Sequence, residues 1–382
     1  MTIKQYLSTS PILFFVLLFT PLLQADVPMP APPTLSASGY LLSDYYSGRI
    51  LAAQDQDQRL EPASLTKIMT AYVVFNELKQ GNLKLDDEVL VSEKAWRTPG
   101  SRMFIEVGKR IKVEDLLRGM IIQSGNDACV ALAEHIAGSE TTFAEVMNNH
   151  ARRLGMTNTH FVNSTGLPDE NHYTTPADIA KVSAATIRDF PEYYALYKEK
   201  EFFFNDIKQH NRNRLLWRDD SVDGIKTGHT EAAGYCLVAS AKREEMRLIT
   251  VVMGTKSEEA RAKASLALLN YGFRFYETHQ LYADGEVVNE ARIWKGAKDQ
   301  LNLGVVNGLT VTIPRNQYKN LDARMSIDPK IMAPIAEGTV VGHVIVNLNG
   351  EEVANEPLVA LEAIDEGGLW QQLRDGVLLW LE

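Results

Sequence analysis

Cysteine is scarce in this 382-residue sequence, which contains only Cys129 and Cys236. Two cysteines allow one disulfide at most, and this excludes the class of small exported proteins held together by several bridges. Cys129 falls in a predicted helix and Cys236 in a predicted strand, so sequence cannot give their separation. A core-rich chain of this length needs no disulfide for stability, and we therefore expect two reduced, largely buried thiols. Cys129, in a helix of apolar and small residues, is expected to keep a high pKa and to have no nucleophilic role.

Clusters of positive charge are also missing. The chain has 39 Lys and Arg against 49 Asp and Glu, a formal net charge of −10, and its basic residues form no run. A nucleic-acid-binding protein needs a surface that neutralises phosphates, so we exclude nucleic acid as a partner. The eight histidines show no ligand-like spacing with one another or with carboxylates. No metal and no other cofactor is therefore predicted.

The apolar run near the N-terminus, Pro11 to Leu23, is too short to span a bilayer comfortably. Together with Lys4 before it and Ala25 after it, the run predicts an export signal over residues 1–25 that is cleaved after Ala25. Leu23 is larger than the residue that signal peptidase usually accepts at its position, so an uncleaved anchor is the alternative.

Hydrophobic residues make up 45% of the chain, enough for a sizeable core. Residues 37–54 predict a hairpin of two short strands, and residues 62–189 are rich in apolar residues at helical spacing. Three alternating stretches within 222–254 predict an antiparallel meander, which a helix over about 257–276 follows. Strands from both ends of one segment, with helices between them, predict an antiparallel sheet covered by helices, which is an α+β fold.

The C-terminal part has a different character. From about Thr278, short alternating stretches separated by Gly, Pro and Asn predict a small all-β domain. The last segment predicts an amphipathic helix, with apolar residues at helical spacing: Leu369, Trp370, Leu373, Val377, Trp380 and Leu381. Its two tryptophans suit a boundary between water and hydrocarbon, which favours an anchor lying in the plane of a membrane. A helix packed on the β domain or used in self-association is the alternative, so a homodimer stays open.

A serine and a lysine lie three positions apart in "EPASLTKIMTAYVVF", residues 61–75, which predicts an amphipathic helix. This spacing puts Ser64 and Lys67 on one face, within hydrogen-bond reach. Taken alone, the pair is common in helices, and its ordinary interpretation is an exposed Ser and a Lys that reaches solvent. Apolar neighbours surround this lysine, however, so we expect burial to lower its pKa and make it a base. The nearby helix N-terminus favours negative charge on the serine oxygen.

Two further short motifs contain residue types that such a nucleophile needs. "QSGND" offers Ser124 and Asn126 on a tight connection, where Gly125 allows the bend; by itself this motif is typical of a helix cap. "IKTGHT" ends a predicted strand with four residues, Lys226, Thr227, Gly228 and His229. By itself that segment is typical of a polar strand end at the surface.

The three motifs together form the S-x-x-K, S-x-N, K-T-G set of penicillin-binding proteins and class A β-lactamases. From Ser38 to about Tyr276, and more loosely to the C-terminus, the chain resembles low-molecular-mass penicillin-binding proteins that are serine-type D-alanyl-D-alanine carboxypeptidases. "PASLTKIMT", "QSGNDACVALAE" and "KTGHTEAAGYCLVASA" carry this resemblance. It implies the α+β transpeptidase fold shared by penicillin-binding proteins and β-lactamases, followed by a C-terminal all-β domain and a terminal amphipathic helix.

The resemblance also implies a division of the chain and a location. After the signal at 1–25, we expect a peptidase domain over 26–277, a β domain over 278–365 and a membrane-anchor helix over 366–382. The mature protein would then be peripheral on the periplasmic face of a bacterial inner membrane.

Roles at matching positions follow from the same resemblance. Ser64 would attack the amide between two D-alanines of a peptidoglycan pentapeptide and become acylated, while Lys67 takes its proton. Asn126 would hold the substrate amide. Gly228 and His229 would belong to the substrate-binding strand, where the His229 N–H and the Ser64 N–H form an oxyanion hole. The His229 side chain is not expected to be the base, because Lys67 fills that role.

The remaining predicted residues act on the leaving group and the substrate carboxylate. Ser124, linked to Lys67 and Lys226, would pass a proton to the leaving amine. Lys226 and Thr227 would bind the free C-terminal carboxylate, with Arg261 from the following helix as a further partner. A solvated arginine on a helix surface is the alternative for Arg261.

β-Lactam antibiotics would be covalent inhibitors of such an enzyme. A β-lactamase is the nearest alternative, but its corresponding loop carries a glutamate that activates the deacylating water. Glu170 is the only glutamate within residues 158–180, and its surroundings do not resemble that motif. A non-catalytic penicillin-binding scaffold is an alternative from another class, against which the intact motif residues count.

Overall fold

The structure, a computed structural model, describes residues 29–381. The predicted export signal and its cleavage site lie outside the described residues, so both stay predictions. Within residues 29–381, none of the helices has the length and apolarity needed to cross a bilayer.

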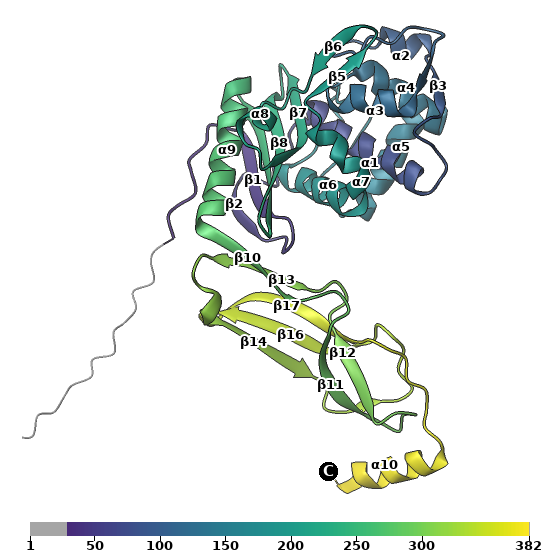
Figure 1. The fold of residues 1–382 in the computed structure, drawn as a ribbon, viewed down its shortest axis with the longest axis vertical. Helices are drawn as coiled ribbons and strands as arrows, with labels where there is room; N and C mark the ends of the chain where they lie inside the picture. The colour runs from purple at the N-terminus through teal and green to yellow at the C-terminus, as the bar shows by residue number, and fades with distance from the viewer. Residues whose placement is uncertain (1–28, 382) are drawn as a thin grey trace, which may run out of the picture. The chain divides into compact units, whose positions relative to one another are not determined.

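A five-stranded antiparallel sheet forms the framework of the first part of the chain, in the order β2-β1-β9-β8-β7 (Figure 1). The N-terminal hairpin supplies β1 (Gly39–Asp44) and β2 (Ile50–Gln54). The later meander supplies β7 (Val222–Thr230), β8 (Gly234–Arg243) and β9 (Met246–Thr255). Since β1 pairs along its length with β9, the two ends of the segment join in one sheet, as predicted.

Side chains of the sheet alternate between two separate cores. Leu41 and Val251 face the core shared with the helical segment, whereas Leu42 and Val252 face the core shared with α9 (Glu258–Phe275). Successive residues of a strand point to opposite faces, so a sheet covered on both sides needs apolar residues at consecutive positions. The prediction of an α+β fold with helices on both faces of the sheet is confirmed.

The segment between the two halves of the sheet is mainly helical. Its helices and turns are η1 (Ala63–Leu65), α1 (Thr66–Lys79), α2 (Glu93–Arg97), α3 (Val113–Ile121), α4 (Asn126–Ala137), α5 (Glu140–Arg153), α6 (Pro176–Asp189), α7 (Pro191–Tyr194), η2 (Ala195–Lys198) and α8 (Leu215–Arg218). Two short hairpins accompany them, β3 (Glu88–Leu90) with β4 (Arg110–Lys112) and β5 (Glu201–Phe204) with β6 (Ile207–His210).

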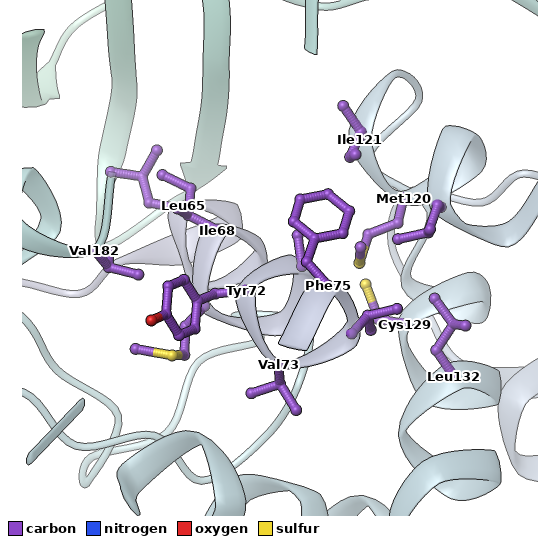
Figure 2. Packing of buried hydrophobic residues seen from close by; sticks show 14 of the residues in the cluster. Leu65, Ile68, Tyr72, Val73, Phe75, Met120, Ile121, Cys129, Leu132 and Val182 are labelled. Atoms are coloured by element: carbon purple, nitrogen blue, oxygen red, sulfur yellow. The ribbon is translucent and has the colours of Figure 1, made fainter. Parts of the chain in front are cut away.

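Helix α1 is buried on every side through residues 66–75. Figure 2 shows Ile68 and Tyr72 on this helix, with Phe75 directed toward Met120 and the other side chains of α3 and α4. The prediction of an amphipathic helix is therefore wrong for this segment, because neighbouring elements cover the side that was expected to meet solvent. A helix surrounded in this way buries its polar residues as well.

The C-terminal part is built from strands with a core of their own. Its elements are β10 (Tyr276–Tyr282), β11 (Val287–Trp294), β12 (Gln300–Gly304), β13 (Leu309–Pro314), η3 (Tyr318–Asn320), β14 (Leu321–Ile327), β15 (Ile331–Met332), β16 (Val340–Leu348) and β17 (Glu351–Ala360). Six strands form a sheet in the order β14-β16-β17-β12-β11-β15, and β10 pairs with β13. Helix α10 (Leu369–Leu381) follows these strands. The predicted β domain and terminal helix are both present.

Candidate active site

Ser64 lies in the turn η1, directly before α1, and lines a cavity of about 440 Å³. One helical turn later, Lys67 places its Nζ 3.0 Å from the Ser64 Oγ. Gly228 on β7 passes close by, and a Cβ there would lie 3.2 Å from the Ser64 backbone nitrogen. Glycine at this position thus lets the strand and the start of the helix come together, which brings the first and third motifs to one place.

The Lys67 side chain is only 1% exposed, and its amine has three hydrogen-bond partners. Besides Ser64, they are the Asn126 Oδ1 at 2.7 Å and the Thr165 carbonyl oxygen at 2.6 Å. The amide orientation of Asn126 is set by its other end, since Nδ2 donates to the Pro99 carbonyl at 2.7 Å. Two partners of the amine are therefore pure acceptors, and the third is a hydroxyl that can donate.

This arrangement matches a neutral amine, which has two N–H donors and one lone pair. Burial lowers the pKa of Lys67, and no carboxylate is among its hydrogen-bond partners in the described part of the chain. In that form the two N–H groups would serve Asn126 and Thr165, and the lone pair would face the Ser64 hydroxyl. Lys67 is thus arranged to accept a proton from Ser64.

Ser124 and Lys226 form the second pair in the site. The Lys226 Nζ donates to the Ser124 Oγ at 3.0 Å and to the Thr227 carbonyl at 3.0 Å. Burial lowers the pKa of Lys226 well below its ordinary value. The link between Ser124 and Lys226 is therefore present, whereas the hydrogen bonds of residues 29–381 include none between Ser124 and Lys67.

The bend that presents Ser124 differs from the expectation. Ser124 itself is in the left-handed region at φ 67°, while Gly125 has an ordinary φ of −59°. Glycine is required at 125 for space, because a Cβ there would lie 2.8 Å from the Asp127 carboxylate. The prediction that Gly125 supplies the bend is wrong, and the strained residue is the one at the site.

Asp127, which the sequence reasoning missed, holds the wall next to Asn126. Its buried carboxylate accepts the backbone N–H groups of Met103, Phe104 and Ile105 at 3.0, 3.0 and 3.3 Å. These bonds pin the loop that contributes Gly100 and Ser101 to the cavity. The sequence shows Asp127 only as an acidic residue in the first turn of a predicted helix. Such a residue usually interacts with the N-terminus of its own helix, so its bonds to another loop were not predicted.

The loop over residues 158–175, which precedes α6, borders the cavity through Thr165, Gly166 and Leu167. Gly166 has φ 83°, and a Cβ there would lie 1.8 Å from the Ala63 carbonyl oxygen, so only glycine lets the loop approach η1 this closely. Glu170 is exposed and is not among the residues that line the cavity. The loop therefore supplies a backbone carbonyl to Lys67 but no carboxylate to a deacylating water.

His172 ties the same loop to the start of α1. Its Nδ1 accepts the Val162 N–H at 3.2 Å, so the proton of the neutral ring is on Nε2, which lies 2.8 Å from the Thr66 Oγ1. Burial lowers the pKa of His172 to about 4, which keeps the ring neutral at physiological pH. His172 therefore helps to hold the Thr165 carbonyl on Lys67, a role that sequence spacing did not reveal.

Cations gather in the part of the cavity lining near Gly228. Arg261 is only 4% exposed, and its Nη1 donates to the Gly228 carbonyl at 3.1 Å while its guanidinium lies 5.6 Å from the Tyr235 ring centroid. The alternative of a solvated helical arginine is wrong for this residue. Arg212 lines the same cavity and was not predicted, and Glu258 is the one acidic residue of the lining. This part of the cavity suits an anionic group such as a carboxylate.

The exposed face of the third motif completes the lining. Thr227, Gly228 and His229 all border the cavity, whereas Lys67 and Lys226 lie behind its wall. The His229 ring packs on the Tyr235 ring with centroids 3.9 Å apart. A role for His229 through its backbone N–H stays a prediction.

Both cysteines are buried free thiols, as predicted. Cys129 lies on α4 behind the site, where its Sγ is 3.2 Å from the Gly125 carbonyl, and burial raises its pKa to about 12. Burial also raises the pKa of Cys236 to about 11. Neither is ionised near neutral pH, so neither competes with Ser64 as a nucleophile.

Comparisons with known proteins agree with this geometry. Residues 26–257 match the D-alanyl-D-alanine carboxypeptidase family Peptidase_S11, and residues 276–366 match the C-terminal domain of penicillin-binding protein 5. The chain is 46% identical over 374 residues to the D-alanyl-D-alanine carboxypeptidase DacC of Escherichia coli, covering 96% of this chain and 93% of that protein.

Solved structures resemble the fold as well. Penicillin-binding protein 5 from Haemophilus influenzae superposes with a TM-score of 0.85 at 44% identity, covering 88% of this chain and 100% of that chain. Penicillin-binding protein D2 from Listeria monocytogenes, solved in an ampicillin-bound form, has a TM-score of 0.58 at 30% identity and covers 63% of this chain and 98% of that chain.

Proposed function

Because the chain belongs to the family of D-alanyl-D-alanine carboxypeptidases, it is a serine-type hydrolase that removes a C-terminal D-alanine, and we propose that Ser64 is its nucleophile. The observation that carries this proposal is the 3.0 Å contact between the Ser64 Oγ and the Nζ of a buried Lys67 that has no carboxylate partner in the described chain. A neutral amine at this distance is positioned to take the hydroxyl proton as the oxygen attacks.

Acylation would join the Ser64 Oγ to the carbonyl carbon between the last two D-alanines, with the hydroxyl proton passing to Lys67. Negative charge then develops on the carbonyl oxygen, and the backbone N–H groups of Ser64 and His229 would stabilise it. The close approach of Gly228 to η1 supports this pairing of the two N–H groups. Each such donor is worth about 3 kcal/mol of transition-state stabilisation.

Breakdown of this intermediate would break the amide bond and release D-alanine. The leaving amine needs a proton, and we assign its delivery to Ser124, whose hydroxyl lies 3.0 Å from the Lys226 Nζ. The proton that Lys67 took from Ser64 would replace the one that Ser124 gives, so that both groups return to their starting forms. Water would then hydrolyse the ester, which restores the Ser64 hydroxyl and releases the shortened peptide. Asn126 would hold the substrate amide beside Lys67, a position supported by its hydrogen bond to that amine.

Recognition of a free C-terminal carboxylate would fall to Lys226, Thr227 and Arg261, which is the feature that makes the enzyme an exopeptidase. Arg212, in the same part of the cavity lining, adds positive potential there. We propose peptidoglycan pentapeptides ending in D-alanyl-D-alanine as the substrate. Exopeptidase action needs no cofactor, since the buried amine supplies the base.

β-Lactams should acylate Ser64 and remain attached. The related penicillin-binding protein D2 was solved in an ampicillin-bound form, which supports this expectation for the family. Glu170 is exposed and does not line the cavity, so it is not placed to activate a deacylating water. We therefore expect no rapid β-lactam hydrolysis.

We further propose the domain division given above, with a peptidase domain over 26–277, a β domain over 278–365 and an anchor over 366–382. The apolar side chains of α10 are exposed and include two tryptophans, a pattern that supports peripheral attachment to a membrane. Together with the predicted export signal, this places the mature enzyme on the periplasmic face of a bacterial inner membrane in our proposal.

Incubation with a peptide that ends in D-alanyl-D-alanine tests the proposed nucleophile. Wild-type protein should release free D-alanine, and penicillin should add its mass to the intact chain. Ser64→Ala should abolish both, with D-alanine release falling about a millionfold, the effect seen when other serine enzymes lose their nucleophile. The exposed Ser326 on β14 offers a matched control, and Ser326→Ala should change neither measurement.

Acylation that persists in Ser64→Ala would show that another residue is the nucleophile. Nitrocefin separates the β-lactamase alternative from the carboxypeptidase. One stoichiometric burst of hydrolysis is expected, whereas sustained turnover would contradict the proposed lack of a deacylating carboxylate.

A further inference from the structure

The side of α10 that carries its polar residues is attached to the β domain, while its apolar side is open. Asp375 is the only buried residue of this helix in the described chain, at 1% exposure. The exposed fractions of the apolar residues are 81% for Leu369, 87% for Trp370, 63% for Leu373, 61% for Val377, 84% for Trp380 and 68% for Leu381. The sequence left an anchor and a packed helix as alternatives. In the structure the polar side of α10 packs on the β domain, and its apolar side is exposed and available to an anchor role.

Asp375 makes the central contact. One carboxylate oxygen accepts the Lys295 backbone N–H at 2.6 Å, and the other lies 2.9 Å from the Arg374 Nε and 3.7 Å from an Arg292 nitrogen. Burial opposes ionisation of this group, but the Lys295 N–H and the two guanidinium groups hold the pKa of Asp375 below its ordinary value. The Arg292 guanidinium in turn stacks 3.6 Å from the Trp294 ring centroid.

Further contacts surround this carboxylate. The Gly367 N–H donates to the Lys295 carbonyl at 2.7 Å, and Arg374 also pairs with Asp299. The two arginines and the two aspartates of this cluster balance in charge. The helix is therefore held by a neutral set of polar contacts, and its outward side offers apolar side chains instead of net charge.

A helix of this kind would not persist by itself in water. It has 13 residues, and isolated helices shorter than about 12 to 15 residues are marginal even for favourable sequences. Gly376 in its interior costs about 1 kcal/mol relative to alanine. An unattached segment would therefore have to fold as it meets a membrane, which reduces its net affinity.

We propose that Asp375 is a positioning residue that locks α10 onto residues 292–299 as a preformed helix, so that the enzyme binds a zwitterionic lipid surface without a folding transition. This inference rests on the membrane attachment proposed above and adds its mechanism. The occupant is the lipid bilayer, because the exposed side carries two tryptophans among aliphatic residues and both arginines of the cluster are already paired. Binding consequently depends on apolar insertion, and salt or anionic lipid changes it little.

Hydrogen exchange of the full chain in buffer without lipid tests the lock. The amides of α10 and of Lys295 are expected to be protected in the wild type and to lose that protection in Asp375→Ala. Asp322→Ala is a matched control, because Asp322 is exposed on β14 and pairs only with the exposed Arg324. Unprotected α10 amides in the wild type would overturn the proposal without any variant.

Partitioning onto vesicles of phosphatidylcholine then tests the consequence. Asp375→Ala should bind about tenfold more weakly than the wild type or Asp322→Ala, with unchanged release of D-alanine from a soluble peptide. Equal binding by Asp375→Ala would overturn the inference. Adding phosphatidylglycerol should change wild-type binding less than about threefold, and a strict need for it would overturn the apolar mode. A wild type with protected α10 amides that ignores both vesicles would overturn membrane attachment while the lock stands.

Discussion

Helices α1 and α10 each bury one charged side chain, with opposite results. Lys67 in α1 and Asp375 in α10 are both 1% exposed. Lys67 has neutral partners only, and its pKa is lowered. Asp375 lies against two guanidinium groups and a backbone N–H, and its pKa is lowered as well, which for an acid preserves the charge. Burial without a counter-ion favours a neutral amine that can act as a base, whereas burial with counter-ions favours a structural contact.

The surroundings of the two helices explain the difference. Residues 66–75 of α1 are covered by other elements on every side, so the lysine amine cannot reach water. Helix α10 is covered on its polar side only, and Arg374 can pair with Asp375 while remaining partly exposed. An enzyme needs the first environment to activate a nucleophile. A contact that holds a helix at the surface needs the second environment, because a charge paired with counter-ions keeps its position without reacting.

The largest expected effect comes from removing the buried amine. Lys67→Met should slow acylation by penicillin about a hundredfold to ten-thousandfold, the range typical for loss of a general base. In the wild type the lowered pKa means that the acylation rate rises with pH and levels off below the ordinary lysine pKa. Stopped-flow acylation across pH measures both. Lys79→Met, at the exposed end of the same helix, is the control.

An acylation rate that keeps rising up to the ordinary lysine pKa would contradict the proposed difference between Lys67 and Asp375. It would show that burial does not remove the charge of Lys67, and that this lysine resembles Asp375 in keeping it.

An intermediate effect is expected at His172, a buried group that also has no counter-ion among its hydrogen-bond partners. Its folded pKa of about 4 is below the ordinary 6.5, so below pH 6.5 protons bind the unfolded chain preferentially. The free energy of unfolding should therefore decrease as pH falls from 6.5 to 4, with about 3 kcal/mol of that decrease due to His172.

His172→Gln should remove this component, because glutamine does not titrate and retains a donor and an acceptor. Denaturant unfolding at several pH values measures the difference from the wild type. His135→Gln, at an exposed position of α4, should retain the full pH dependence. If the two variants behave alike, His172 is not held neutral by burial.

The smallest effect on catalysis is expected from removal of α10, the second helix of the comparison. Deletion of residues 366–382 should leave kcat/KM for a soluble peptide within about twofold of the wild type, because no residue of α10 lines the cavity. The same deletion should move the protein from the membrane to the soluble fraction. Fractionation that does not change would contradict the anchor, and a large loss of activity would contradict the separation of the two roles.

Parts of the site could be predicted because their geometry is local. Ser64 and Lys67 meet through helical spacing alone, and the apolar side of 366–382 follows from the same periodicity. The hairpin, the meander and the terminal helix were likewise visible as patterns. The bend at Ser124 was assigned to Gly125 instead, since sequence shows which residue tolerates a positive φ but not where space is needed.

Contacts between distant segments could not be predicted in the same way. Thr165, His172 and Arg212 reach the site from loops whose composition is ordinary, and no spacing relates them to Ser64. Asp375 is the buried residue of its helix, and no pattern in the sequence indicated that burial. Each of these positions depends on which surface another part of the chain covers.

The sequence by itself determined the three motifs, their chemical types and the elements that carry them, because local spacing follows from the covalent geometry of helices and strands. The tertiary structure decided how the ionisable side chains, Lys67 and Asp375 among them, bind protons. A lysine becomes a base, and an aspartate keeps its charge, according to which partners and how much water remain around each one after the chain has packed.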